Sequence, residues 1–380
     1  KVKNIQLGDS TNAKNIASDM DITSLYKSIL PIMRKRIKEW VVPNAVDATM
    51  SLFKSHLEKQ LKQFKVLVSE YERVIVKNST RKQFVLANAP GNIKGYALAY
   101  VCRKNDILLM SSQHGVTIEI SKAHDIMQIA FDNSVSDIMF SYNSRIIDIE
   151  KSTYFDKSKH YCVGMPLRLI RMRQMKRTSK STPPIVFIST NLYHMGFSLA
   201  QKTDYGNAVY EHDIVVKVLS RLPHKVRYKT YPEDNRRYAD IDPVLNDLKK
   251  FDNIELFSDK LDMRYLISEH RVLVTTGATS TLGWPVMSGK PVIFINQKEN
   301  NPLTDDAYIS LSKGIFVFDG DDKDFYKKLR NFLSQPINEI ERLWKEKKNA
   351  RKEMIENYFS AYEGGAGKRA AKILLKEYIT

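Results

Sequence analysis

Residues with hydroxyl side chains gather directly after one of the apolar runs of the sequence. The run at 272–276 ends in two threonines, and Gly277, Thr279, Ser280 and Thr281 follow where helical spacing begins. The first N–H groups of a helix and the helix dipole favour an anion, and a glycine lets the backbone approach it closely. Ser and Thr also cap helices that bind nothing, but a cap needs only one such residue. The stretch therefore predicts a cradle for phosphate.

A basic loop follows the strand expected at 225–232. Lys229, Pro232 and Arg236 lie in the segment KTYPEDNRRYADIDP (229–243). Proline fixes a turn, and Lys and Arg side chains neutralise phosphate charge. The alternative is that these loop charges face water. We expect the three residues to join the phosphate site.

One histidine stands at the end of an expected strand, in the segment SSQHGV (111–116). Ligands of open parallel sheets bind beyond the carboxyl ends of the strands. An imidazole at that place can act as a general base or hydrogen-bond a sugar or phosphate. A lone histidine is more often structural or simply exposed. We expect His114 to be catalytic and its neighbours Gln113 and Gly115 to bind the acceptor.

Carboxylates become relevant if the reaction is glycosyl transfer, because they serve as bases or nucleophiles. The sequence does not rank the candidates well, which are Glu119, Asp204, Glu211, Glu233 and Asp234. We expect Glu119 and Glu211 to be catalytic. The Asp-x-Asp pattern, a metal signature in one class of sugar-transferring enzymes, occurs in several unrelated contexts here, so it carries little information. We expect no essential metal and no cofactor.

The elements that must position these residues alternate between strand and helix. Residues 22–65 show helical spacing, and from 73 onwards short apolar runs alternate with helical segments. Such alternation predicts parallel sheets covered by helices, in an α/β fold class. A basic, proline-ended segment interrupts the series. We expect an N-terminal α/β domain over 1–166, a linker over 167–183, a second α/β domain over 184–362, and a C-terminal helix over 363–380 that crosses back to the first domain.

The composition indicates a globular protein with an anionic partner. The chain has 380 residues, a net charge of +17 and two cysteines. So few cysteines suit a reducing compartment, and no signal peptide is visible, so we expect a cytoplasmic protein. The excess of positive charge fits nucleic acid, an anionic membrane or phosphate-bearing small molecules, and a solvated basic surface without a special partner is the plain alternative. No nucleic-acid-binding signature is present, whereas stretches such as IMRKRIKEW (32–40) mix basic and apolar residues as membrane-surface helices do.

Several motifs together give the chain a recognisable likeness. They are SSQHG, HYCVGMP, VFIST, KTYPED, TTGATSTLGWPVMSGKPVIFIN and GGAGKRAAKIL. With these, the chain resembles bacterial surface-polysaccharide glycosyltransferases of the GT-B fold, in particular the Kdo-type enzymes of capsule and lipopolysaccharide synthesis. CDP-glycerol-type transferases are a more distant resemblance. The likeness runs from about residue 70 to the end and is weak before residue 65.

The resemblance implies two Rossmann-like domains that face a central cleft, with the nucleotide donor on the C-terminal domain and the glycan acceptor on the N-terminal one. It implies that Thr279, Ser280 and Thr281 hold the donor phosphate, with Lys229 near it and His114 on the acceptor side. It also implies catalysis without a bound metal. One departure is Val116, which stands where the family often carries a second glycine after Gln-His-Gly.

The sequence thus predicts a glycosyltransferase that takes a sugar from a nucleotide-activated donor, best a CMP-activated Kdo-like ulosonic acid. The acceptor is a bacterial surface glycan or lipid-linked glycan, and the enzyme works peripherally at the inner face of the cytoplasmic membrane. Alternatives of the same fold are a UDP- or GDP-hexose glycosyltransferase and a CDP-polyol phosphotransferase. A non-catalytic nucleotide-sugar-binding module and, least favoured, a nucleic-acid binder are alternatives of other classes.

Overall fold

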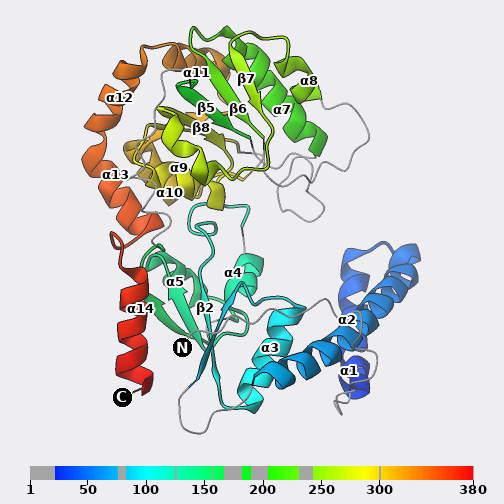
Figure 1. Ribbon diagram of the computed structural model, residues 1–380. Helices are drawn as coiled ribbons and strands as arrows, with labels where there is room; N and C mark the ends of the chain where they lie inside the picture. The colour runs from blue at the N-terminus through cyan, green and yellow to red at the C-terminus, as the bar shows by residue number, and fades with distance from the viewer. Residues whose placement is uncertain are drawn as a thin grey trace. The chain divides into compact units, whose positions relative to one another are not determined.

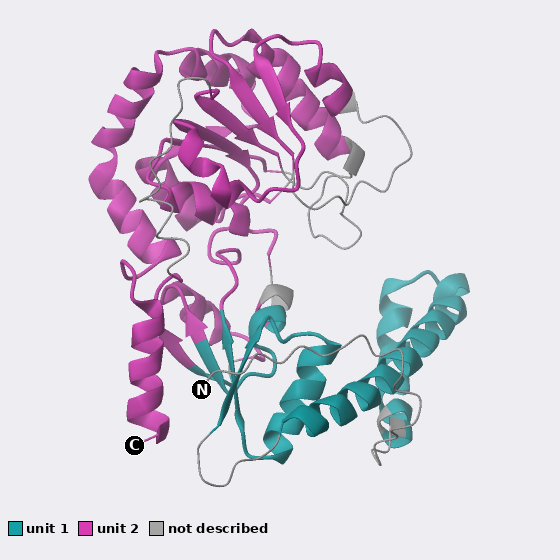
Figure 2. Ribbon diagram, in the orientation of Figure 1, with its two compact units in different colours: residues 1–112, 130–139, 157–159 teal, residues 113–129, 140–156, 160–380 magenta. Residues whose placement is uncertain are grey.

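The computed structural model describes most of the chain. The described residues are 22–75, 83–124, 126–155, 157–166, 182–189, 204–230, 243–298 and 301–379. They divide into two compact units, coloured separately in Figure 2: residues 1–112, 130–139 and 157–159 in unit 1, and residues 113–129, 140–156 and 160–380 in unit 2. The expected linker falls largely on residues 167–181, outside the described residues, so the expected domain boundaries stay predictions.

The first sheet has four strands in the order β1-β2-β3-β4. The strands are β1 (Phe84–Asn88), β2 (Leu108–Ser112), β3 (Ile138–Ser141) and β4 (Lys159–Cys162). β1 and β2 pair in parallel, with Phe84 opposite Leu108. The helices between them are α3 (Ile93–Lys104), α4 (Ile126–Asn133) and α5 (Arg145–Glu150). The chain therefore rises through each strand in the same direction and returns through a helix.

The second sheet lies within unit 2 and has six parallel strands in the order β10-β9-β8-β5-β6-β7. The strands are β5 (Ile185–Ile188), β6 (Val226–Lys229), β7 (Ile254–Phe257), β8 (Val272–Thr276), β9 (Val292–Asn296) and β10 (Phe316–Asp319). Every residue of β5, β6, β8 and β9 is buried. Such runs of Val, Ile and Phe are what a parallel sheet covered on both faces requires.

Helices cover this sheet, as Figure 1 shows. They are α7 (Asp204–Lys217), α8 (Pro243–Leu248), α9 (Ser280–Met287), α10 (Asp305–Gly314), α11 (Phe325–Leu333), α12 (Ile337–Glu346) and α13 (Lys348–Met354). One continuous hydrophobic core joins them to the strands and also takes in Val116, Ile120 and Tyr142. Val116, where the resembling family often has glycine, is therefore a packed core residue here.

Two long helices form the N-terminal segment, α1 (Ile22–Trp40) and α2 (Val46–Val74), joined by the short η1 (Pro43–Ala45). The predicted helical segment is confirmed, but the apolar run that starts at residue 73 does not begin as a strand, because Arg73 and Val74 end α2. Leu67, Val68 and Tyr71 continue the helical face of α2 and are buried in the cluster that includes Val101 of α3. This packing overrides the preference of the β-branched Val74 for a strand.

The C-terminal segment breaks at its paired glycines, Gly364 and Gly365. The π-helical turn η6 (Ile355–Phe359) leads to Gly364 and Gly365, both at positive φ (71° and 72°), before α14 (Ala366–Leu374) and η7 (Leu375–Ile379). Arg369 donates to the Val163 carbonyl at 2.8 Å, and the Tyr161 hydroxyl of β4 donates to Glu377. Within unit 2, the last helix therefore lies beside β4 and the residues after it.

The two parallel α/β sheets and the helical N-terminal segment confirm the predicted fold class. In the part of the chain that the structure describes, no helix is long and apolar enough to cross a membrane.

Candidate functional site

The order of strands in the second sheet marks one place where a ligand can enter. The chain goes from β5 through β6 to β7 in one direction, then returns to β8 on the other side of β5 and continues to β10. Neighbouring loops therefore leave in opposite directions at the carboxyl ends of β5 and β8, and ligands of open α/β sheets bind at such a switch point. The hydroxyl-rich residues 275–281 follow β8 at this point.

The loop after β8 is shaped by one glycine and one threonine. Gly277 has a φ of +78°, in the left-handed region that favours glycine. Thr279 is the N-cap of α9, and its hydroxyl accepts from the Thr281 N–H at 3.3 Å. The first four N–H groups of a helix lack acceptors within the helix, and this cap satisfies one of them. Thr279, Ser280 and Thr281 are half-buried, so their hydroxyls and the start of α9 can meet an anion.

A second loop lies against the start of α9. An added Cβ at Gly115 would stand 2.4 Å from the Ser280 Cβ, so the backbone after β2 touches the first residue of the helix. Both loops belong to unit 2. His114, half-buried, directly precedes Gly115. The structure thus brings the Gln113–Gly115 segment to the predicted phosphate cradle.

Buried hydrogen bonds fix the second loop. The Gln113 amide donates to Glu119 Oε1 at 2.5 Å and to the Gly115 carbonyl at 3.0 Å, and its oxygen accepts from the Tyr142 N–H at 2.9 Å. Glu119 also accepts from the Thr117 N–H at 3.0 Å and from Asn143 Nδ2 at 3.2 Å. Burial raises the pKa of Glu119, and these hydrogen bonds oppose the rise. Glu119 is thus placed to hold the loop, and a catalytic role for it stays a prediction.

Glu211 lies at the same sheet end as the switch point. Only 1% of its surface is exposed, so it is not a loop acid facing water. Its carboxylate accepts from the Ser189 hydroxyl at 2.8 Å and from the Tyr228 hydroxyl. Ser189 directly follows β5, whereas Glu211 itself comes from α7. The catalytic role of Glu211 stays a prediction, now with two hydroxyl groups beside it.

Lys229 ends β6 but does not present a free ammonium group. Its Nζ donates to the Thr230 carbonyl at 2.6 Å and to the Asp259 carbonyl at 3.1 Å, and the residue is 1% exposed. Burial lowers the pKa of Lys229. Two of the three donors of its ammonium group are thus engaged, and its phosphate-binding role stays a prediction. Pro232 and Arg236, with the acids Glu233 and Asp234, lie outside the described residues, as does the side chain of Asp204.

Three residues of the site were not expected from the sequence. Asn143 connects Glu119 to the Tyr358 carbonyl, to which it donates at 2.9 Å, while Ser189 and Tyr228 hold Glu211. Each contacts a residue at least 17 positions away in the chain, so no local spacing marks them. The one available signal was that Ser189 and Asn143 follow apolar runs, as His114 does.

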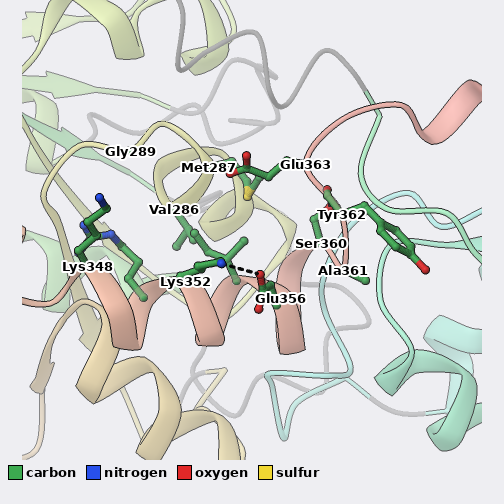
Figure 3. Close-up of a pocket in the computed structure, with 12 residues that line it drawn as sticks. Val286, Met287, Gly289, Lys348, Lys352, Glu356, Ser360, Ala361, Tyr362 and Glu363 are labelled. Carbon is green, nitrogen blue, oxygen red and sulfur yellow. Dashed lines mark hydrogen bonds and ion pairs between the residues drawn. The ribbon is translucent and has the colours of Figure 1, made fainter.

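A cavity of about 280 Å³ lies at the other end of α9, as Figure 3 shows. Val286, Met287 and Gly289 line one side of it, and Lys348, Lys352 and residues 360–363 line others. Lys352 and Glu356 form an ion pair at 3.8 Å along its wall. None of the predicted site residues lines this cavity, so it is separate from the phosphate cradle. Among the described residues, no group of three or more His, Cys, Asp or Glu side chains is placed to hold a metal ion.

No known family model matches the sequence, and no curated protein matches it. Solved structures do share its fold. A putative UDP-N-acetylglucosamine 2-epimerase from Listeria monocytogenes is 13% identical, with 84% of this chain and 80% of that chain covered and a TM-score of 0.53. UDP-GlcNAc 2-epimerase from Neisseria meningitidis, bound to UDP-GlcNAc, is 12% identical over 84% and 82% of the two chains, with a TM-score of 0.53.

The S. aureus protein MnaA with UDP is 11% identical over 82% and 78% of the chains, with a TM-score of 0.51. At such identities the likeness establishes the fold, which is GT-B-like, and leaves the activity to be argued from the site.

Proposed function

We propose that the protein is a glycosyltransferase that takes a sugar from a nucleotide-activated donor and transfers it to a glycan acceptor. One observation carries the proposal: the hydroxyl-rich start of α9 lies at the switch point of the second sheet and touches the loop of His114 through Gly115. The first feature suits a phosphate, and the second brings an imidazole-bearing loop to it.

In the proposed reaction, the bond between the anomeric carbon and the donor phosphate oxygen breaks, and a bond from an acceptor hydroxyl oxygen to that carbon forms. The leaving phosphate gains negative charge as its bond breaks. The start of α9, with the hydroxyls of Thr279, Ser280 and Thr281, stabilises this charge through groups fixed before the reaction begins. His114 takes the proton that the acceptor hydroxyl loses, for which a histidine near neutral pH is suited.

Two donor classes have support of different kinds. The motifs of the sequence support a CMP-activated Kdo-like ulosonic acid, as in the transferases that the chain resembles. The fold supports a UDP-activated sugar, because solved structures that share it hold UDP or UDP-GlcNAc. These structures also favour a second candidate function, a UDP-sugar 2-epimerase, since two of them are described as such enzymes.

Thermal unfolding with CMP, CDP, UDP and GDP tests the donor site. A nucleotide at a hundred times its dissociation constant adds about 2.7 kcal/mol to the free energy of unfolding. We expect a clear rise in melting temperature with one pyrimidine nucleotide. The absence of any rise with all four would contradict the proposed donor site. A nucleotide-induced rise without any sugar transfer or epimerisation would identify a binding module instead.

Turnover separates the transferase from the epimerase. We expect His114→Ala to lower transfer to a glycan acceptor by about 10²–10⁴-fold, the usual contribution of a general base, with nucleotide affinity nearly unchanged. Glu211→Gln retains the side-chain size but removes the charge, and it should also lower turnover if Glu211 is catalytic. Conversion of UDP-GlcNAc to its 2-epimer without any acceptor would favour the epimerase, and normal turnover by both variants would refute the catalytic assignments.

A further inference from the structure

The helices α1 and α2 form a hairpin that carries only a small hydrophobic core of its own. Ile37 of α1 packs with Val46 and Met50 of α2 to form this core. Between residues 54 and 63 of α2, no side chain is buried. The later part of α2 packs on α3, where Leu67, Val68 and Tyr71 are buried. Figure 1 shows α1 and α2, which η1 joins in the chain. The hairpin tip therefore adds few buried side chains to the packing around the first sheet.

Large apolar side chains remain exposed around this tip. Trp40 is 75% exposed and Val42 is 64% exposed at the turn, while Leu52 of α2 is 74% exposed and Ile32 of α1 is 63% exposed. Single exposed apolar residues are ordinary, but these four stand within residues 32–52, on the two sides of one turn. Trp is the side chain that prefers a boundary between water and an apolar phase.

The same hairpin is strongly basic. Residues 22–65 contain nine Lys or Arg and three Asp or Glu. Arg34 pairs with Asp47 and Arg36 pairs with Glu39, and the exposed Lys35, Lys38 and Lys54 stand in the same stretch of sequence as the four apolar residues. Basic residues that flank exposed Trp and Leu side chains match a bilayer surface with anionic headgroups, where the apolar side chains insert and the cations meet the phosphates.

We propose that the tip of the α1–α2 hairpin docks the protein on an anionic lipid surface, through Trp40, Val42, Leu52 and Ile32 together with the surrounding lysines. This inference goes beyond the proposed function, and its test needs neither donor nor acceptor. A protein partner with an apolar groove would be served by the exposed side chains alone. The excess of positive charge around them favours the lipid.

Co-sedimentation with vesicles tests the proposal. We expect the protein to bind vesicles of phosphatidylglycerol and phosphatidylcholine and to leave pure phosphatidylcholine vesicles largely free. A double variant with Trp40→Ser and Leu52→Ser should lower the partition coefficient by about tenfold or more, because it removes inserted apolar surface. The matched control is Tyr154→Ser, which changes a side chain that is 86% exposed outside the hairpin, and it should bind as the parent does.

Charge provides a second, independent test. Lys35→Glu with Lys38→Glu should weaken binding to the anionic vesicles by about tenfold, whereas Lys249→Glu with Lys260→Glu, also exposed, should have little effect. Binding should also fall at 1 M salt, where the screening length shrinks to about 3 Å. Far-ultraviolet circular dichroism of each variant verifies that the helices remain.

Three results would overturn the proposal. They are equal binding of parent and double variant to anionic vesicles, equal binding of the parent to anionic and neutral vesicles, and self-association of the parent that the double variant abolishes, which would assign the tip to a second copy of the chain. Transfer to a soluble acceptor should be the same in parent and double variant. A failure of docking can therefore be distinguished from a failure of the proposed enzyme activity.

Discussion

The six-stranded sheet has polar residues at both of its ends, but the two ends use them differently. At the amino end, the Arg227 guanidinium bonds to Glu255 at 2.8 Å and to Glu269 at 3.0 Å. Next to them His270 is fully buried, and Lys290 donates to the Ser268 carbonyl at 2.7 Å. At the carboxyl end, the hydroxyls of residues 279–281 are half-exposed around the start of α9.

The comparison indicates that the two ends of the sheet have different roles, one in stability and the other in ligand binding. At the amino end, the buried Arg227 is already paired with two partly exposed glutamates, so its charge stabilises the fold and is not free for a ligand. Hydroxyls and N–H groups at the carboxyl end remain accessible at the switch point, where a phosphate can complete their hydrogen bonds. Substitutions at the amino end should therefore change stability, and those at the carboxyl end should change binding or turnover.

The largest effect is expected where the two loops of the carboxyl end meet. Gly115→Ala places a Cβ 2.4 Å from the Ser280 Cβ, so one backbone must move. We expect turnover to fall by about a hundredfold, because a displacement of about 1 Å has that effect on aligned groups. Stability should fall by about 1–3 kcal/mol, as for other overpacked sites. Steady-state kinetics and denaturant unfolding measure the two changes.

Gly283→Ala is the matched control, since it lies in α9 itself and its added Cβ would meet only Met165 Cε, at 3.9 Å. It should leave turnover unchanged and raise stability slightly, by up to about 1 kcal/mol, through helix propensity. Equal turnover of the two variants would show that the contact between Gly115 and Ser280 has no functional role.

The next largest effect is expected when the ion pairs at the amino end are removed. Arg227→Met leaves Glu255 and Glu269 without their shared cation, and Arg227 itself has only 11% of its side chain exposed. We expect a loss of about 1–3 kcal/mol in the free energy of unfolding, between the values for surface and buried pairs, because Arg227 is buried whereas both glutamates can regain water. Nucleotide affinity of the folded protein should not change. Denaturant unfolding and calorimetric titration give the two quantities.

Arg271→Met provides the comparison for this loss. Arg271 binds Glu341 through two hydrogen bonds of 2.8 and 2.7 Å, but both side chains are about one-third exposed. Its loss should cost about 1 kcal/mol or less, as for surface pairs. A similar cost for both variants, or a loss of nucleotide binding in Arg227→Met, would contradict the division between the two ends.

Much of this division could be predicted from the sequence, because its signals are local. The apolar run before Thr276, the glycine at 277 and the hydroxyls at 279–281 are neighbours in the chain. The structure confirms the strand and the helix start, and it adds the positive φ of Gly277. Lys229 shows the limit of such reasoning. Its charge predicts a phosphate ligand, which stays a prediction, whereas no local pattern marks its hydrogen bond to the Asp259 carbonyl, 30 residues away.

Local sequence also could not predict where α2 ends or which side chains hydrogen-bond Glu119 and Glu211. Strand propensity at Val74 is a local quantity, whereas its place in α2 depends on packing against α3. Asn143 and Tyr228 become visible only when strands distant in sequence are brought together. Local sequence patterns therefore predicted the loop at residues 275–281. The buried hydrogen bonds of Glu119 and Glu211 could be found only from the folded structure.

Acid should test the amino end without any substitution. Burial lowers the pKa of His270 to about 4, with the charges of Arg227 and Lys290 acting in the same direction. In the unfolded chain the pKa is about 6.5, so between these values the unfolded state binds a proton that the folded state lacks. This contribution to stability is complete above pH 6.5 and is lost as the pH falls, by about 2 kcal/mol at pH 5.

Parallel melting curves of the parent and of His270→Asn between pH 7 and pH 5 isolate this contribution from that of other groups. The parent should lose more stability on acidification than the variant does. The increase in melting temperature on adding nucleotide should be the same in the parent and the variant. Identical pH dependence of the two proteins would show that His270 is not held neutral by its surroundings.

The smallest effect sharpens the contrast at the carboxyl end, because it should move stability and binding in opposite directions. Thr281→Asp places a negative charge in the first turn of α9, which should stabilise the protein by about 0.5 kcal/mol through the helix dipole. The same carboxylate should repel a bound phosphate and weaken nucleotide binding by about tenfold. Thr281→Val, which keeps the size and adds no charge, should weaken binding less. Thermal unfolding with and without nucleotide measures both changes. If the aspartate variant binds nucleotide as tightly as the parent, the donor phosphate does not lie at the start of α9. The carboxyl end of the sheet would then not be the ligand-binding end.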